Sequence, residues 1–582
     1  MSTETGKFRR LLFIFGGLWH KSTFPFALLT HGLMIPANLL DNSADAEYNQ
    51  RHGNPFLFYG TLRNTFLFLH ESWYGMFSKN ASRYQACGFF TLLFSLLAHG
   101  YRYYSLCFSG DAMLLTQQGE AVYQSTLGRY LQPVYWMIRG EMTVPPIIGL
   151  FATAFLMFSC MLMANLFRLD RKRDIALLSA LLVTHETFAV SNATYLPWTD
   201  VYALALLFAT AGAYVFLLSG ARTLLSIPFF FLSLGLYQSY LPVAAVLIIL
   251  VLIRRTLDGA KPKDTLLTGL AACGCILAGL ILYAVVLKIV MNRLGSIVSD
   301  EYNGVGALTH FAYNRIGEYL LQTLLTPIRF LFVPGASDVI SSHTPAISPV
   351  LNLLLLALCG VMLFPRAKDL PAASKGMLLL LVLLLVPAMN FVQFIAQGLA
   401  SGLTIYAYVF FDVAVLLLAA SALNAQSRFC RLAARGAQLL LCVIIAQNTF
   451  LSNRLAFKRD VEWSSTLSAM TRVLDRIEQT EGYVPGETPV VLVGILTSSS
   501  ISMTHPGFES LESYQGARYT YAASYETSTY WYLKMALGAR VNLVDEDERR
   551  IRSTPAVTDS LTIFPDAQCC QMIDGVLYIR LG

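Results

Sequence analysis

Long apolar segments recur along this chain of 582 residues, and they constrain its fold more than any other feature. Runs of roughly 18 or more apolar residues can cross the ~30 Å hydrocarbon core of a bilayer as helices. They must be helical there, because lipid offers no water to satisfy backbone polar groups. The mean hydropathy of +0.54 is too apolar for a soluble protein of this size, and only 13% of the residues are charged. We therefore expect an all-α polytopic membrane protein.

From Cys87 onward, hydropathy predicts about eleven membrane-spanning helices. They lie near Cys87–Phe108, Val144–Phe167, Asp174–Val190, Val201–Leu218, Thr223–Tyr237, Tyr240–Ile253, Thr265–Val290, Ile347–Phe364, Gly376–Ala396, Leu403–Leu423 and Gly436–Leu451. Residues 1–86 are mixed in character. Their amphipathic, aromatic-rich stretch Phe56–Phe77 favours one or two interfacial helices in a cytoplasmic N-terminal region, with a pair of membrane-inserted segments as the alternative.

Basic residues predict the orientation of the spans. An even number of predicted spans separates each of four basic clusters from the next, so all four fall on one face, together with the basic N-terminus. The clusters are Arg168 to Arg173, Arg254 to Lys263, Arg366 to Lys375 and Arg428 to Arg435. The positive-inside rule makes this face cytoplasmic. The net charge of +6 is spread over these connections, so it indicates topology and no nucleic-acid partner.

The opposite face then carries four substantial segments. They are the loop that opens at Asp111, the connection His185–Asp200, the loop from Arg293 to about Ala346, and the C-terminus from Ser452. The C-terminal segment is charged and helix-periodic at first and then shows three candidate strands. The helical stretch is Ala456–Gln479, and the strands are Pro489–Ile495, Ala539–Val544 and Gly575–Arg580. We predict a multispan domain over residues 87–451 and a small extracytoplasmic α/β domain over residues 452–582.

Polar side chains gather in the first outward loop, where hydrophobic packing does not explain them. Asp111 could take a proton from an attacking hydroxyl as a general base, although a helix cap or a hydrated loop carboxylate is the alternative. Arg129 suits a phosphate, which a guanidinium grips through two N–H groups; an interfacial arginine is the alternative. Glu120 and Arg139 lie in the same loop. A carboxylate base beside arginines that stabilise a leaving phosphate indicates group transfer from a phosphate carrier to an alcohol.

Further candidates lie in the other outward segments. Glu186, beside His185 near the end of a span, could bind sugar hydroxyls, act as a second carboxylate or pair structurally with an arginine. Tyr237 and Gln238 form a polar hairpin that could stack on and hydrogen-bond a sugar, or simply make a tight turn. Two arginines of the third loop are candidates for phosphate contact, Arg315 and Arg329. No His, Cys, Asp or Glu spacing predicts a metal site, and the sequence leaves a divalent-metal requirement open.

The order of these motifs resembles that of a known family. The Asp111 loop, Leu127-Gly128-Arg129-Tyr130, the turn at His185-Glu186 and the hairpin Gly235–Ser239 are similar to those of the Gtr-type, GtrII-like glucosyltransferases of bacterial O-antigen, over about Cys87–Leu451. The resemblance implies a GT-C-like architecture. It also implies transfer of a hexose, glucose foremost, from a polyprenyl-phosphate carrier. The acceptor would be a surface polysaccharide of lipopolysaccharide or a glycolipid, at the periplasmic face of the bacterial inner membrane.

The resemblance also implies that Asp111 activates the acceptor hydroxyl and that the sugar is inverted. Relatives carry two adjacent acidic residues where this chain has Gly110 and Asp111, so Glu120 or Glu186 would supply any second carboxylate. No cofactor is expected beyond the lipid-linked donor. Two rivals stay open: a lipid-linked saccharide transporter or flippase, which would hold polar groups in broken helices near the midplane, and a polysaccharide ligase or polymerase that uses the same carrier.

Overall fold

The computed structural model describes residues 80–110, 112–113, 116–117, 119–218, 220–299, 306, 311–333, 347–397, 401–497, 507–511 and 526–582. The chain divides into two compact units, Met1–Ala86 and Cys87–Gly582. The interfacial helices predicted within residues 1–79 lie outside the described residues, and so does Asp111 itself. The second unit contains every predicted span.

Each predicted span coincides with a helix. In chain order these are α4 (Ala81–Tyr104), α7 (Pro145–Leu166), α8 (Lys172–Thr184) with α9 (Glu186–Thr194), α10 (Thr199–Leu218), α11 (Ile227–Leu236), α12 (Leu241–Leu257), α13 (Pro262–Leu294), α15 (Ile347–Lys368), α16 (Ala372–Ile395), α17 (Val409–Ala422) and α18 (Arg428–Gln479). Within the described ranges, eight helices are long and apolar enough to cross a membrane; α11 and α17 are apolar but shorter, and α4 is not among the eight. The predicted helical membrane fold is confirmed.

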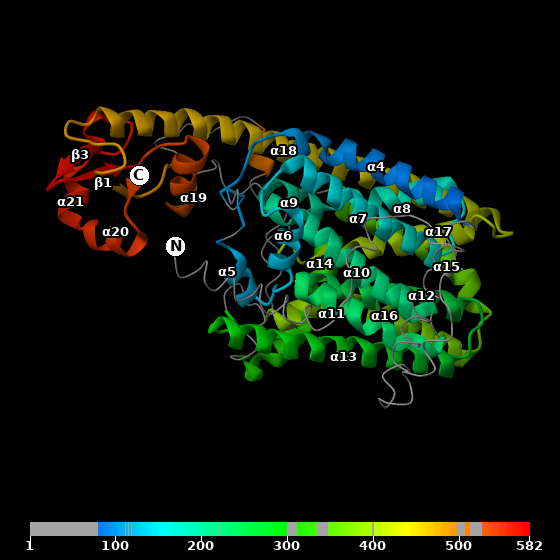
Figure 1. Ribbon diagram of the computed structural model, residues 1–582. Coiled ribbons are helices and arrows are strands. Elements are labelled where there is room, and N and C mark those ends of the chain that lie inside the picture. The colour runs from blue at the N-terminus through cyan, green and yellow to red at the C-terminus, as the bar shows by residue number, and fades with distance from the viewer. Residues whose placement is uncertain are drawn as a thin grey trace, which may run out of the picture. The chain divides into compact units, whose positions relative to one another are not determined.

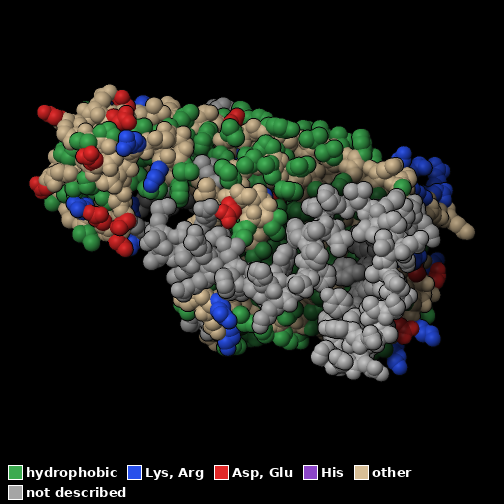
Figure 2. Space-filling model, viewed as in Figure 1, with side chains coloured by type: hydrophobic (Ala, Val, Ile, Leu, Met, Phe, Trp, Pro, Cys, Tyr) green, Lys and Arg blue, Asp and Glu red, His purple; other side chains and the backbone are tan. Residues whose placement is uncertain are grey.

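The helices differ in how deeply they are buried. In the apolar part of Lys172–Thr194, 94% of the residues are buried, against 28% for α13, α15 and α16. These three outer helices expose leucine side chains, for example Leu277, Leu353 and Leu383, as a lipid-facing surface requires. Figure 2 shows a largely hydrophobic surface over the helices, with Lys and Arg gathered at the end where Figure 1 labels α15 and α17.

The basic connections meet at that end of the helical bundle. Three contacts cross between them: Arg254 to the carbonyl oxygen of Phe167, Arg366 to Asp258 at 2.7 Å, and Arg171 to the side-chain oxygen of Asn424. Together they join the α7–α8, α12–α13 and α17–α18 connections and the last turn of α15. The four predicted clusters therefore share one face, and the assignment of that face to the cytoplasm stays a prediction.

Helix α18 runs without a break for 52 residues, from the bundle to the C-terminal strands (Figure 1). The predicted span Gly436–Leu451 and the predicted helical stretch Ala456–Gln479 are parts of this one helix. The sequence between them contains neither glycine nor proline, so no residue there interrupts the helical hydrogen bonds.

A four-stranded sheet of order β2-β1-β4-β3 forms the end of the chain. Strand β1 (Pro489–Val493) is parallel to β2 (Asn542–Leu543) and β4 (Val576–Arg580), and β3 (Cys570–Ile573) is antiparallel to β4. The three predicted strands are confirmed, whereas β3 was not predicted. Three short helices accompany the sheet: α19 (Glu526–Trp531), α20 (Glu546–Arg552) and α21 (Pro555–Ser560).

One hydrophobic core joins the loop between α4 and α7, the predicted first outward loop, to this sheet. Phe108 and Met113 of the loop pack in the same cluster as Met470 and Val473 of α18 and Leu577 of β4. The loop that precedes and follows Asp111 is therefore held between the membrane helices and the C-terminal strands.

Candidate active site

The first outward loop folds into two short helices, α5 (Ala121–Thr126) and α6 (Gln132–Arg139). Each is followed by a glycine in the left-handed region, Gly128 with φ 80° and Gly140 with φ 100°, a backbone conformation that side chains with a Cβ rarely adopt. Gly140 ends α6 by donating its N–H to the carbonyl oxygen of Trp136 at 2.9 Å. The two glycines thus fix the direction of both helices.

The predicted Arg129 and the predicted Tyr237–Gln238 hairpin lie together. The Gln238 amide nitrogen donates to the carbonyl oxygen of Leu127 at 3.2 Å, and the Arg129 guanidinium carbon is 4.8 Å from the centre of the Tyr237 ring. Gly235 permits this approach, because a Cβ there would lie 2.7 Å from the Leu131 side chain. A cation over an aromatic face, beside an amide, offers the ring face and hydrogen-bonding groups that a sugar can bind.

A series of aromatic rings leads from this hairpin to His185. The Tyr237 ring centre is 5.9 Å from that of Tyr240, the Tyr240 centre is 5.4 Å from that of Tyr406, and the Tyr406 centre is 5.4 Å from that of His185. His185 interrupts the span between α8 and α9 with extended dihedrals, φ −55° and ψ 141°. Its Nδ1 accepts the N–H of Thr187 at 3.3 Å, and Glu186 lies buried in the first turn of α9.

Arg139 forms a fully buried ion pair with a carboxylate that we did not predict. Its Nη1 donates to Oδ1 of Asp200 at 2.6 Å, with side chains only 1% and 0% exposed. The Tyr135 hydroxyl donates to the other carboxylate oxygen at 2.8 Å. Burial, together with the Asp200 charge, raises the pKa of Tyr135, so its phenol stays protonated and remains a donor.

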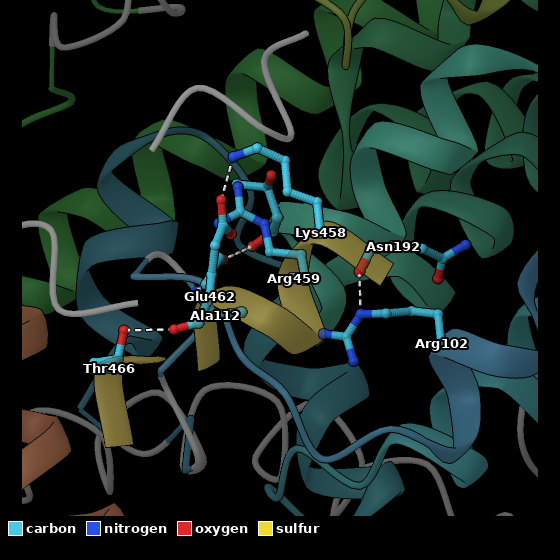
Figure 3. A network of polar contacts seen from close by, with 9 residues as sticks. Arg102, Ala112, Asn192, Lys458, Arg459, Glu462 and Thr466 are labelled. Carbon is cyan, nitrogen blue, oxygen red and sulfur yellow. Dashed lines mark hydrogen bonds and ion pairs between the residues drawn. The ribbon is translucent and has the colours of Figure 1, made fainter. Parts of the chain in front are cut away.

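A second buried charge cluster lies where α4 ends against α9 and α18 (Figure 3). We call it the cation cluster: Arg102, Lys458, Arg459 and Glu462, each at most 2% exposed. Arg102 donates from Nε to the carbonyl oxygen of Asn192 at 2.8 Å. Arg459 binds Glu462 at 2.6 Å, and Lys458 binds the other oxygen of the same carboxylate. Lys458 and Arg459 thus share the Glu462 carboxylate, while the buried Arg102 guanidinium donates to backbone carbonyl oxygens.

The residues that flank Asp111 in sequence lie at this cluster. The Phe108 ring centre is 6.0 Å from the Arg102 guanidinium carbon and 5.6 Å from the Trp463 ring on α18. Ala112 is fully buried, and Figure 3 draws it among the residues of the network. Arginine and lysine in a dry environment attract anions strongly, so the cluster can hold a phosphate or orient a carboxylate.

Residues 108–419, more than half of the chain, match the model of the family described as Glucosyl transferase GtrII. The chain belongs to this family. No curated protein sequence and no solved structure is similar to it. As a GtrII member with at least eight candidate spans in its described ranges, the chain is a membrane glucosyltransferase. The expected GtrII resemblance is confirmed over a somewhat shorter range than Cys87–Leu451.

Within the GtrII match lie Arg129, Arg139, His185 and the hairpin, whereas Arg102 and the cations of α18 lie outside it. The sequence offered little indication that these residues outside the family match belong to a site. Arg102 follows an apolar run and is typical of an interfacial arginine, and the four-residue spacing of Lys458 and Glu462 is typical of an exposed helix pair.

The remaining predicted residues of this GtrII glucosyltransferase lie elsewhere. Glu120 precedes α5 and accepts a hydrogen bond from Gln124 at 3.4 Å. Helix α14 (Ile316–Phe332) carries Arg329 on its exposed side. Just before it, the exposed Arg315 pairs with Glu318 at 2.7 Å. In the described part of the chain, no group of three His, Cys, Asp or Glu side chains is arranged to hold a metal ion.

Proposed function

We propose that this glucosyltransferase moves a hexose, glucose foremost, from a polyprenyl-phosphate carrier to a surface polysaccharide such as the O-antigen of lipopolysaccharide, or to a glycolipid. The reaction takes place at the periplasmic face of the bacterial inner membrane. Family membership supports the sugar. The shared face of the basic connections supports the orientation, because the Asp111 loop lies at the opposite ends of the spans.

The cation cluster is the observation that carries the choice of donor. Arg102, Lys458 and Arg459 bring three positive charges into one buried region, and cations in a dry environment attract a phosphate strongly. A lipid-borne phosphodiester supplies an anion for these cations and reaches the site from the membrane.

In the proposed reaction Asp111 removes the proton of the acceptor hydroxyl, whose oxygen attacks the anomeric carbon. The bond from that carbon to the phosphate oxygen breaks on the opposite side, so the sugar is inverted. Polyprenyl phosphate leaves with an additional negative charge, which the cation cluster stabilises. Glu120 or Glu186 supplies a second carboxylate if one is required, and no cofactor takes part.

The other predicted contacts have roles in binding. Arg129, Tyr237 and Gln238 form the platform for a sugar of the substrate, and His185 closes its far side through the ring of Tyr406. We propose that Arg315 and Arg329 of the α14 region contact the phosphate of the lipid-linked donor as it enters the site.

A lipid-linked saccharide flippase is the second candidate. The interruption at His185, within a span that is 94% buried, is the kind of broken helix that transporters use. The two functions differ in product, since a flippase moves labelled lipid between leaflets without making a glycosidic bond. The two functions can be separated in sealed proteoliposomes that carry labelled polyprenyl-phosphate glucose in one leaflet and contain acceptor. A transferase gives glucosylated acceptor, whereas a flippase moves the labelled lipid to the other leaflet.

The donor is tested by lipid binding to the full chain in nanodiscs. Arg102→Gln should weaken the binding of polyprenyl phosphate at least about tenfold, because a charged hydrogen bond is worth about 1.5–3 kcal/mol. Arg102→Lys should retain part of the affinity. The control Arg366→Gln removes an arginine that pairs with Asp258 at the opposite end of the bundle and should change nothing. Use of a nucleotide sugar in place of the lipid-linked donor would refute the proposal.

A further inference from the structure

Four buried N–H groups around α6 have no hydrogen-bond partner among the described residues. They are Nε and Nη2 of Arg139, Nε1 of Trp136 and Nε1 of Trp198. The side chain of Arg139 is 1% exposed, and Trp136 and Trp198 are 1% and 8% exposed. Folded proteins pair the large majority of such groups, so their concentration in one place points to a ligand.

The four groups belong to one cluster. Trp136 and Arg139 are three residues apart on α6 and share a helix face. The ring centre of Trp136 lies 6.4 Å from that of Trp198, which is in the short helix η2 (Leu196–Trp198). Arg139 also donates to the carbonyl oxygen of Pro197 at 3.1 Å. We call Trp136, Arg139 and Trp198 the indole cluster.

The chemistry of the indole cluster selects a neutral ligand with many acceptors. All four free groups are donors. The charge of Arg139 is already balanced by Asp200, whose carboxylate is held further by the Tyr135 hydroxyl at 2.8 Å and the Val201 N–H at 3.0 Å. A phosphate would find no surplus positive charge here, in contrast to the cation cluster. Sugar hydroxyls offer the acceptors, and indole rings offer apolar faces with a polar edge.

We propose that the indole cluster binds the hexosyl group of the lipid-linked donor, a role that rests on the proposed function. The position fits. Ser109 donates to the carbonyl oxygen of Thr194, four residues before Trp198, at 2.6 Å, while its neighbour Phe108 lies against Arg102 of the cation cluster. The segment Phe108–Ser109 thus contacts the phosphate site on one side and the turn that carries the sugar site on the other.

Two lipids test this assignment on the full chain in nanodiscs: polyprenyl phosphate, and polyprenyl phosphate that carries glucose. Trp136→Phe and Trp198→Phe keep a ring but remove the N–H. Each variant should weaken binding of the glucose-bearing lipid about tenfold and change the affinity for the sugar-free lipid by no more than about twofold. The matched control Trp531→Phe, in α19 beside the C-terminal sheet, should bind both lipids as the wild type does.

Binding of the glucose-bearing lipid at wild-type affinity by both cluster variants would overturn the proposal. If a variant fails to fold, the wild-type chain still decides, because it must bind the glucose-bearing lipid more tightly than the sugar-free one. Equal affinities would show that the sugar makes no contact. Failure of the wild type to bind either lipid would instead refute the proposed donor, so the two failures are distinguishable.

Discussion

Ser109 donates its hydroxyl to the carbonyl oxygen of Thr194 at 2.6 Å, which ties the start of the first outward loop to the end of α9. The Ser109 hydroxyl oxygen also accepts the N–H of Ala112 at 3.1 Å. Ser109 and Ala112 flank Asp111 in the sequence, and both are buried. One hydroxyl therefore fixes the backbone on both sides of the predicted catalytic residue.

Ser109→Ala should impair both stability and transfer. It leaves the buried Thr194 carbonyl short of one partner, at a cost of about 1–3 kcal/mol if that group finds no other. The Ala112 N–H keeps the Ser109 carbonyl oxygen at 3.0 Å but loses the hydroxyl that also held it. We expect a lower midpoint of thermal unfolding in detergent and a glucose-transfer rate reduced by about tenfold or more. Ser109→Thr keeps the hydroxyl and should recover most of the rate. Equal rates in the wild type and the alanine variant would show that this anchor does not position the loop.

Gly235→Ala should separate the hairpin from the first loop. The added Cβ would lie 2.7 Å from the Leu131 side chain, whose backbone N–H is bonded to the Gly235 oxygen at 3.0 Å. The shift would move Tyr237 away from Arg129, and KM for the substrate bound there should rise. Gly274→Ala on α13 is the control, since nothing lies within 4 Å of its Cβ. Its effect on KM should be nil.

Glu462→Gln should destabilise the protein strongly. The change removes the carboxylate that Lys458 and Arg459 share, and breaking a buried ion pair typically costs about 3–5 kcal/mol. We expect a marked fall in the thermal midpoint that added polyprenyl phosphate partly reverses, because the lipid restores an anion. Glu478→Gln, at an exposed site of the same helix, should leave the midpoint nearly unchanged. A similar small effect at both sites would contradict the cluster's role.

Asp200→Asn should disrupt the support of Arg139. It leaves a buried guanidinium without its charge partner, with an expected loss of about 3–5 kcal/mol. Tyr135→Phe removes only one hydrogen bond to the same carboxylate and should cost about 0.5–1.5 kcal/mol. The two variants can be compared by thermal unfolding and by binding of the glucose-bearing lipid. An effect of Tyr135→Phe as large as that of Asp200→Asn would be inconsistent with this geometry.

Much of the fold could be predicted from the sequence, because hydropathy and basic residues report directly on lipid exposure and topology. Each predicted span has its helix, and contacts such as Arg366 to Asp258 bring the basic connections together. Strand β3 was missed, since its four residues, Cys570–Ile573, are too short to show a pattern and are fixed by pairing with β4.

The site was predicted only in part. The hairpin and Arg129 were expected near the substrate and do lie together. Asp200 was missed because an acidic residue in the first turn of a helix is typical of an N-terminal cap, and only the tertiary fold brings Arg139 to it. The cation cluster depends on α18 packing against α9, a contact between segments more than 250 residues apart that no local pattern reports.

The central claim is that the chain transfers glucose from a polyprenyl-phosphate donor with Asp111 as the base. The most direct measurement is the rate of labelled glucose transfer to acceptor by the full chain in nanodiscs, for the wild type and for Asp111→Asn. General-base catalysis contributes about 10²–10⁴-fold, so we predict a fall of at least about 100-fold in the variant, with donor binding retained. Transfer by Asp111→Asn at the wild-type rate would contradict the account.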